Sequence, residues 1–314
     1  MYQKPYLTIP QQVELLRDRG MLVEDEAKAS EYLQRIGYYR LSAYWHPMRL
    51  RNKHTNEVTS RFCEGATFKA ATDLYIFDGR LRLIMLDALE RLEVSLRTEV
   101  ALSIGSHDPK AHRNLSVLGR DFGNPVRPGG ITKHREWLQR LDNRASVSKD
   151  QFAIHFRTKY PNDDMPIWMA VELMDFGPLS HLISGLTNSD LAKIGSHYGG
   201  INPILLKSWA RSMAFSRNVC AHHSRLWNKP LVNQPALSGK AIPVDLRHLH
   251  NLHDSGKRLY TIACIARFML KFANPRTSWK DRFVDHIMTF PATNQISLSS
   301  AGFPNDWQTE SLWR

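Results

Sequence analysis

The sequence predicts an all-α protein, a bundle of helices, on three observations. Apolar residues recur every three or four positions over long stretches, most clearly from Phe68 to about Ile104, and this is the period of a helix with one buried face. Glycine and proline, which end or open helices, separate these stretches. The alternation of apolar and polar residues that is typical of half-buried strands is scarce. Helices packed on helices around one core account for this pattern.

The elements follow in order from local signals. Pro10 opens a short amphipathic helix that stops near Gly20, and an aromatic-dense segment is hinged at Gly37. Residues 50–66 are polar and predict a loop or hairpin. No proline interrupts the apolar period after Phe68, so either one long helix or two helices with a bend are expected there. The remaining helices are expected at residues 25–36, 132–159, 167–177, 189–199, 202–227 and 245–273.

These elements predict three regions. Residues 1–66 form a helical and aromatic N-terminal extension packed on the bundle. Residues 67–275 form the helical domain, and residues 276–314 form an irregular, partly apolar C-terminal tail.

Composition limits the class of protein. Lys and Arg outnumber Asp and Glu by 42 to 30, a formal net charge of +12, which makes a polyanion such as RNA a plausible partner. Only three cysteines occur, far apart, so neither a disulfide framework nor a zinc site is expected, and a reducing cytoplasm is the expected location. We expect no metal or other cofactor. The N-terminus lacks the apolar core of a signal peptide, and no membrane span is expected.

A candidate site for phosphodiester chemistry lies in the run FSRNVCAHHSRLWN, residues 215–228. Arginine can grip a phosphate with two parallel hydrogen bonds, and histidine can take and give protons near neutral pH. Arg217 and His222 lie five positions apart, so on a regular helix their directions differ by about 140°. They can converge at a helix end or kink, which Asn218 would favour, or across a symmetric dimer. The alternative is that His222 and His223 are packed or surface histidines beside a structural Arg225.

An aromatic block and a pair of charged residues on the long helix are the next candidates. Tyr39, Arg40 and Trp45 belong to an aromatic block that could stack RNA bases and hold phosphate, or could form a core that pins the N-terminal region. Glu93 and Arg97 have the i, i+4 spacing of a surface ion pair, which contributes ~0.2–0.5 kcal/mol. The tryptophans Trp168 and Trp209 lie on apolar helical faces and are expected in the core.

Several blocks together resemble a known family. RNVCAHHSRLWN resembles the Arg-x4–6-His motif of HEPN ribonucleases, and in that superfamily a polar residue follows the arginine. The chain is more specifically similar to the abortive-infection proteins of bacteria, the AbiD/AbiF type of the Abi family. The blocks that carry this similarity are KPYLTIPQQVELLRDRGM, YLQRIGYYRLSAYW, FDGRLRLIMLDALERLEVSLRTEV, MPIWMAVELMDFGPLS and AGFPNDW.

The resemblance implies a HEPN-like bundle and a metal-independent endoribonuclease with a toxin-like role in phage defence. It implies that Arg217 and His222 are the catalytic pair, that Asn218 orients them, and that His223 is an accessory proton carrier unless packing explains it. A supporting role for Glu93 and Arg97, facing the catalytic cleft from the long helix, is implied as the alternative to the surface pair. A homodimer with two motifs in one cleft is implied as well. RNA would be the substrate, contacted by Arg40, Tyr39, Trp45 and Arg225, and a small structured RNA could regulate the protein. The alternative function is a non-catalytic RNA-binding module.

Overall fold

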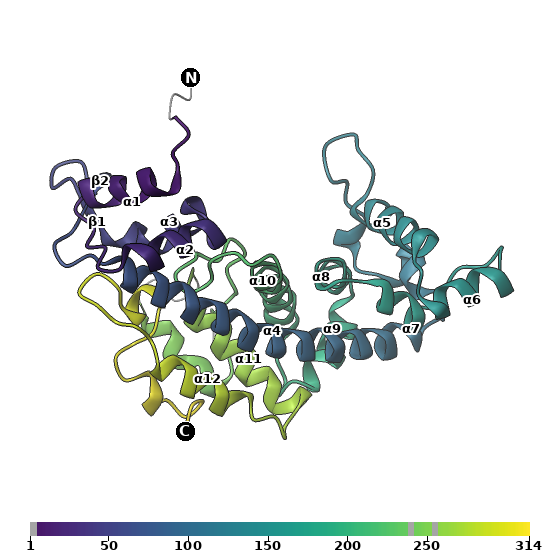
Figure 1. Ribbon diagram of the computed structural model, residues 1–314. Coiled ribbons are helices and arrows are strands. Elements are labelled where there is room, and N and C mark those ends of the chain that lie inside the picture. The colour runs from purple at the N-terminus through teal and green to yellow at the C-terminus, as the bar shows by residue number, and fades with distance from the viewer. Residues whose placement is uncertain (1–4, 238–241, 253–256) are drawn as a thin grey trace.

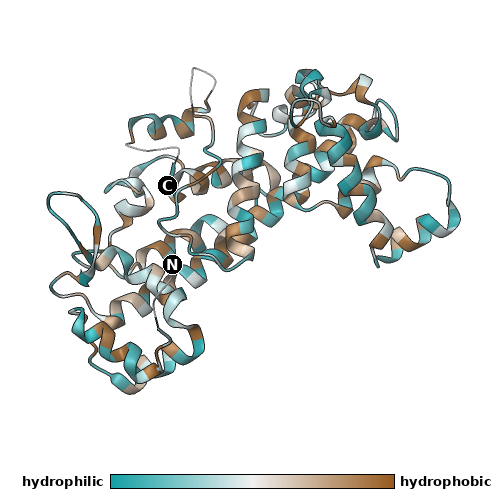
Figure 2. Cartoon of the chain, turned by 90° about the horizontal axis from the view of Figure 1, so that it is seen from above, coloured by the Kyte–Doolittle hydropathy of each residue, from teal (hydrophilic) through white to brown (hydrophobic). Residues whose placement is uncertain are grey.

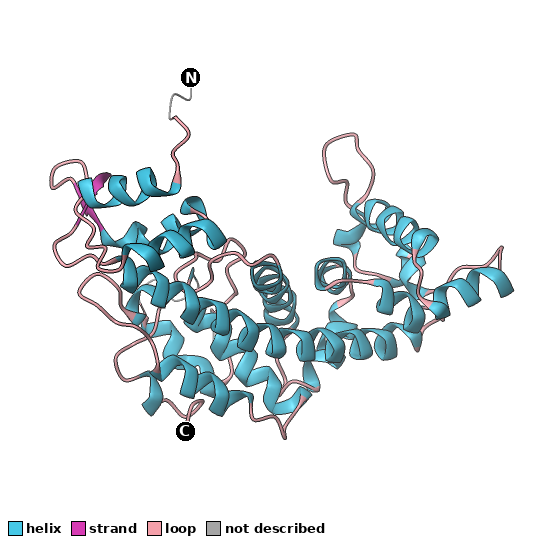
Figure 3. Ribbon diagram, viewed as in Figure 1, coloured by secondary structure: helices cyan, strands magenta, loops and turns pink. Residues whose placement is uncertain are grey.

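The computed structural model describes residues 5–237, 242–252 and 257–314, and helices dominate it (Figure 3). The predicted all-α class is therefore confirmed. One antiparallel pair of short strands accompanies the helices in the described part of the chain. The elements are α1 (Ile9–Asp18), α2 (Glu26–Ile36), α3 (Tyr38–Trp45), β1 (Arg49–Arg51), β2 (Val58–Phe62), α4 (Phe68–Gly105), α5 (Lys133–Val147), α6 (Gln151–Lys159), α7 (Ile167–Ala170), α8 (Phe176–Ser184), α9 (Asn188–Ser196), α10 (Pro203–Ala221), α11 (Leu259–Ala273) and α12 (Trp279–Met288).

Helix α4 organises the molecule. It runs unbroken for 38 residues, so of the two sequence expectations, one long helix or two with a bend, the structure has the first. The Thr67 side chain caps its first turn by accepting a hydrogen bond from the N–H of Ala70 at 2.9 Å. Helices α3, α10, α11 and α12 pack along it, and Figure 1 shows it crossing most of the molecule. The other elements are therefore positioned relative to α4.

The N-terminal helices and the hairpin gather at one end of α4 (Figure 1). Gly37 has φ +90°, a conformation that favours glycine, and joins α2 to α3 at the predicted hinge. Strands β1 and β2 form the hairpin expected around residues 50–66. Tyr44 and Trp45 of α3 are buried. Figure 2 shows hydrophilic and hydrophobic residues on the same helices throughout the molecule, as helices with one buried face require.

Two expectations for the middle of the chain are wrong. The single helix expected over residues 132–159 is divided into α5 and α6 at Ser148 and Asp150. The Ser148 hydroxyl donates to the Asp150 carboxylate at 2.7 Å, and such local bonds offer the backbone an alternative to the helix. In the segment 167–177, α7 is only four residues long, and Gly177 does not end it. Gly177 and Pro178 instead lie in the first turn of α8, where proline is well tolerated.

The C-terminal residues 276–314 are more ordered than the predicted irregular tail. Helix α12 falls inside them, and its Trp279 ring stacks on Phe283 at 4.9 Å between centroids. The indole N–H of Trp279 donates to the carbonyl of Ile84 on α4 at 2.7 Å. Trp313 stacks on Phe283 at 5.2 Å. Aromatic burial, which carries no helical period once α12 ends, fixes this segment to the bundle.

Two further helices are shorter than predicted. Helix α10 ends at Ala221, whereas the expected helix runs to residue 227. Helix α11 begins at Leu259, and a 3-10 helix covers Val244–Asn251; residues 253–256 of that expected span lie outside the described residues. None of the described helices is both long enough and apolar enough to cross a membrane.

Candidate functional site

The histidine of the candidate motif lies where α10 ends. The helix continues regularly through Asn218 and stops at Ala221, so His222 caps its C-terminus with an exposed side chain. The motif therefore lies at a helix end, as its spacing requires, but the helix does not break at Asn218. In the described part of the chain no hydrogen bond joins the side chains of Arg217 and His222. Within one chain the two groups point in different directions.

A left-handed residue closes this helix. His223 has φ +56°, and its N–H donates to the carbonyl of Cys220 at 3.1 Å. The N–H of Ser224 donates to the carbonyl of Val219 at 3.0 Å. These two bonds form a Schellman motif, in which glycine is the usual left-handed residue. A side chain at that position costs roughly 1–2 kcal/mol, and such strain is often stored at functional sites.

The arginine of the motif is half-buried against two carboxylates. Its Nε lies 3.4 Å from Glu93 Oε2 on α4, and its Nη2 lies 3.9 Å from Asp175 Oδ1, just before α8. Its Nη1 also donates to the Asn218 side-chain oxygen at 3.4 Å. Arg217 and Asn218 therefore lie together, and a guanidinium with five N–H donors keeps capacity for a phosphate.

Glu93 and Arg97 form the predicted ion pair, but the pair is not on the surface. Glu93 is only 4% exposed, and Arg97 Nη2 lies 2.5 Å from Glu93 Oε1. The same Arg97 atom donates to the carbonyl of Met174 at 2.6 Å. Burial raises the pKa of Glu93, although Arg97 and Arg217 act against that shift. The surface interpretation is therefore wrong, and the pair contacts the candidate site through Arg217.

Asp175 is a site residue that the sequence interpretation missed. Arg144 of α5 forms an ion pair with it, and this is the main cause that lowers the pKa of Asp175. Cations and carboxylates therefore alternate from Arg97 through Glu93, Arg217 and Asp175 to Arg144. A sequence signal was present, since an aspartate two residues before Gly-Pro is typical of a helix start.

A buried carboxylate fixes the chain that follows the motif. Asp78 of α4 is fully buried and accepts hydrogen bonds from the backbone N–H groups of Leu226 and Trp227 at 2.8–3.2 Å. Arg82 Nη1 and the Tyr44 hydroxyl also donate to it, at 2.6 and 2.8 Å. Burial raises the pKa of Tyr44, so its hydroxyl keeps the proton that it donates. The turn after His223 is thereby tied to the core.

The aromatic helix α3 also holds this turn. Arg40 Nη1 donates to the carbonyl of His223 at 2.8 Å, and Arg225 Nη1 donates to the carbonyl of Ala43. Arg40 and Arg225 were predicted to contact RNA, and in this structure each binds a backbone carbonyl across the α3–turn contact. Burial, followed by the nearby arginines Arg49 and Arg225, lowers the pKa of His46.

The aromatic candidates divide by exposure. Tyr39 is 91% exposed and remains available for stacking. Trp45 is fully buried, with its ring 5.1 Å from Tyr38, so the prediction that it contacts RNA is wrong. Trp209 lies in the core as expected, whereas Trp168 is 51% exposed and contradicts the core expectation. The helical spacing of apolar residues alone could not tell the buried aromatic side chains from the exposed ones.

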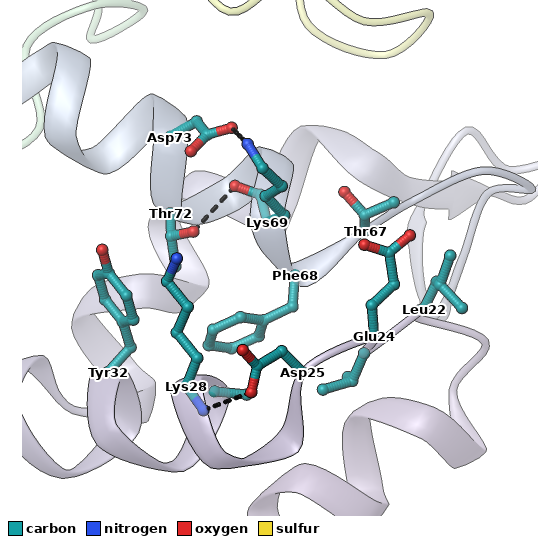
Figure 4. A pocket seen from close by; sticks show the side chains of 12 residues that line it. Leu22, Glu24, Asp25, Lys28, Tyr32, Thr67, Phe68, Lys69, Thr72 and Asp73 are labelled. Atoms are coloured by element: carbon teal, nitrogen blue, oxygen red, sulfur yellow. Dashed lines mark hydrogen bonds and ion pairs between the residues drawn. The ribbon is translucent and has the colours of Figure 1, made fainter.

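A small pocket lies away from the motif, between α2 and the start of α4 (Figure 4). It measures about 220 Å³. Its polar groups bind one another: the Asp25 carboxylate accepts from the N–H of Lys28 at 2.9 Å, and Lys69 pairs with Asp73 at 2.5 Å. Among the described residues, no three His, Cys, Asp or Glu side chains are placed to hold a metal ion. The surroundings of Arg217 and His222 therefore remain the candidate site.

Comparison with known proteins identifies the class. Residues 31–228 match the model of a family described as Abi-like protein. This range begins within α2 and ends six residues after His222, so it contains α4, the ion-paired Arg217 and the capped end of α10. The chain belongs to the Abi-like protein family, and membership supports a role in abortive infection, a defence against phage. No curated protein and no solved structure matches the chain.

Proposed function

We propose that the protein is a metal-independent endoribonuclease of the HEPN type, which defends bacteria against phage by cutting RNA. One observation carries the proposal: the Arg217–Asn218–His222 segment occupies the solvent-facing end of α10, where a strained turn presents an exposed imidazole. Side chains from α3, α4 and the start of α8 contact this segment and the residue that follows it: Arg40 binds the carbonyl of His223, and Glu93 and Asp175 pair with Arg217. Such support is typical of residues that must be oriented for chemistry.

The chemistry needs only these side chains and the substrate. The RNA 2′-oxygen attacks the adjacent phosphorus, the 2′-O–P bond forms and the P–O5′ bond breaks. His222 takes the 2′ proton, and the departing 5′-oxygen receives a proton from a second imidazole or from water. Arg217 stabilises the negative charge on the phosphoryl oxygens. The products carry a 2′,3′-cyclic phosphate and a 5′-hydroxyl.

A second copy of the chain completes the proposed site. Because α10 is regular up to Ala221, the directions of Arg217 and His222 differ by about 140° within one chain. A two-fold symmetric pair can place Arg217 of one copy opposite His222 of the other. The proposed enzyme is therefore a homodimer with a shared cleft.

The test is cleavage of mixed RNAs in EDTA by the wild type and by Arg217→Ala and His222→Ala. Arg135→Ala and His155→Ala remove exposed side chains of the same kinds from α5 and α6 and serve as controls. We expect cleavage by the wild type and the controls, and a loss of at least about 100-fold in each motif variant. Equal cleavage by all five proteins would refute the proposal.

One observation favours the second candidate, a non-catalytic RNA-binding module that sequesters or is regulated by a small structured RNA. In the single chain, Glu93 and Asp175 already hold the guanidinium of Arg217. Under this alternative the five proteins bind RNA equally and none of them cuts it. RNA that purifies with the protein, recovered and sequenced, would identify the bound species.

A further inference from the structure

A basic groove runs beside the candidate site. It measures about 700 Å³ and is lined by residues of α5, α8 and α10, which lie in a row above α4 in Figure 1. Asn218 of the motif lines it. A second hollow of about 450 Å³ shares Arg211 and Asn233 with the groove and extends it toward Lys207.

The charges of this groove distinguish it from two other pockets of the molecule. Lys133, Arg140 and Arg211 line it against a single carboxylate, Glu136. Glu136 binds Arg140 at 2.6 Å, whereas Lys133 and Arg211 have no carboxylate within ion-pair distance in the described ranges. Acidic residues outnumber basic ones in the small pocket of Figure 4 and in the pocket along Asp87–Glu99. An anion is therefore the ligand that this groove favours.

Arg211 is held in place for such a ligand. Its Nε donates to the Ser184 hydroxyl at the end of α8 at 3.0 Å, and the residue lines the groove. His181 lies on the same wall. Burial, and then the positive charges of Arg211 and Arg140, lower the pKa of His181. Two positive side chains thus act on this wall besides its burial.

The groove leads to the motif along one face of α10. Arg211, Phe215, Asn218 and His222 follow a spacing of four, three and four residues, so on a regular helix their directions lie within about 60° of one another. The half-buried ring of Phe215 offers an apolar surface among the cations. Arginine and lysine for phosphate, with an aromatic ring for a base, are the combination that binds single-stranded nucleic acid.

We propose that this groove binds the RNA strand next to the scissile linkage, with backbone phosphates on Arg211 and Lys133 and a base against Phe215. The proposal rests on the proposed ribonuclease function and names its substrate as single-stranded RNA. A groove of about 700 Å³ has the size of a small-ligand site, which suits one or two unpaired nucleotides and not a duplex.

The test measures binding in a protein that cannot cut. In a His222→Ala background, the affinity for a fluorescent single-stranded RNA is measured by anisotropy from low to high salt. The logarithm of the binding constant falls as the logarithm of the salt concentration rises. For a single strand, each lost phosphate contact makes this negative slope shallower by about 0.7. We expect that loss for Arg211→Gln, and about 1.4 for Arg211→Gln with Lys133→Gln. Arg211→Lys keeps the charge and should keep the slope.

Arg135→Gln is the matched control, because Arg135 is exposed on α5, two residues from Lys133, and does not line the groove. An unchanged slope in the double variant, or an equal fall in the control, would overturn the groove proposal. Tighter binding of a duplex than of the single strand would also overturn it. Wild-type protein that binds RNA through the groove but never cuts it would refute the nuclease alone.

Discussion

At the scale of single residues, the motif depends on side chains that lie far from it in sequence. Asp78 and Asp175 fix the two sides of the site, yet neither was singled out from the sequence. Asp78 lies on the same helical face as three fully buried residues, Leu74, Leu81 and Met85. A charged residue on an apolar face indicates a buried charge that needs partners, so Asp78 could have been found from the sequence. Glu93 was found, but helical spacing alone could not tell a surface pair from a buried one.

Asp78→Asn should destabilise the protein. The change leaves Arg82 buried without its ionic partner, and loss of one member of a buried pair costs roughly 3–5 kcal/mol. Urea denaturation, followed by circular dichroism, should show a lower midpoint with an unchanged slope. Asp73→Asn, which removes an exposed pair from the same helix, should change the midpoint far less. Equal midpoints for the two variants would contradict the role of Asp78.

His223→Gly should stabilise the protein, because glycine adopts φ +56° without strain. The expected gain is about 1 kcal/mol, seen as a higher Tm. His222→Gly is the control: its φ is −89°, so glycine should give no gain there. Cleavage by His223→Gly at the wild-type rate would assign the histidine to packing, and reduced cleavage with a raised Tm would assign it to proton transfer.

At the scale of elements, helices with a long, uninterrupted apolar period were predictable. Helix α4 lacks proline and buries one face along its length, so period and length agreed. The wrong helix boundaries came from local interactions that override the apolar period. The hydrogen bond between Ser148 and Asp150 separates α5 from α6, and Gly177 and Pro178 lie in the first turn of α8 where a helix end was expected. Helix α12 was missed although its buried residues Trp279, Phe283 and Ile287 follow the helical spacing, because the helix is short and its partners, such as Ile84, lie far away in the sequence.

The position of His181, on the wall formed by α8 and α10, leads to a prediction about its pKa. Burial is the main cause that holds the pKa of His181 below its usual value, and Arg211 adds to it. Arg211→Gln should therefore raise this pKa, though not to about 6.5, because burial remains. An NMR titration of the imidazole measures the change. Arg135→Gln should leave the titration unchanged, and a pKa unaffected by Arg211→Gln would place that charge away from the groove.

The sign of the stability effect follows from linkage. The folded pKa of His181 is lowered, so the unfolded chain binds more protons below about pH 6.5. Stability is full above that value and is lost as the pH falls from there through the folded pKa. Arg211→Gln should make this loss smaller, which pH-dependent urea denaturation can follow.

At the scale of the whole molecule, α4 connects the N-terminal helices at one end to α5 and α6 near the other (Figure 1). The motif turn is held by α3, and Asn218, one turn before it, lines the groove of α5, α8 and α10. The sequence located the motif but not this setting. The groove is made by three helices that are distant in sequence, so its charge could not be read from any one segment.

A shared cleft predicts complementation between inactive chains. Arg217→Ala and His222→Ala, mixed and allowed to exchange subunits, form heterodimers with one intact composite site. Random exchange should restore about a quarter of the wild-type activity. Light scattering establishes that dimers are present. An inactive mixture of exchanged dimers would show that each site belongs to one chain.

The most direct measurement follows cleavage of an oligonucleotide in EDTA, once the cut site is mapped, with the 2′-hydroxyl removed at that one nucleotide. The RNA should yield a 2′,3′-cyclic phosphate and a 5′-hydroxyl. The 2′-deoxy version should bind equally well and stay intact at that linkage. Cutting of the 2′-deoxy linkage at the same rate would mean that Arg217 and His222 do not direct the RNA's own hydroxyl onto its phosphate.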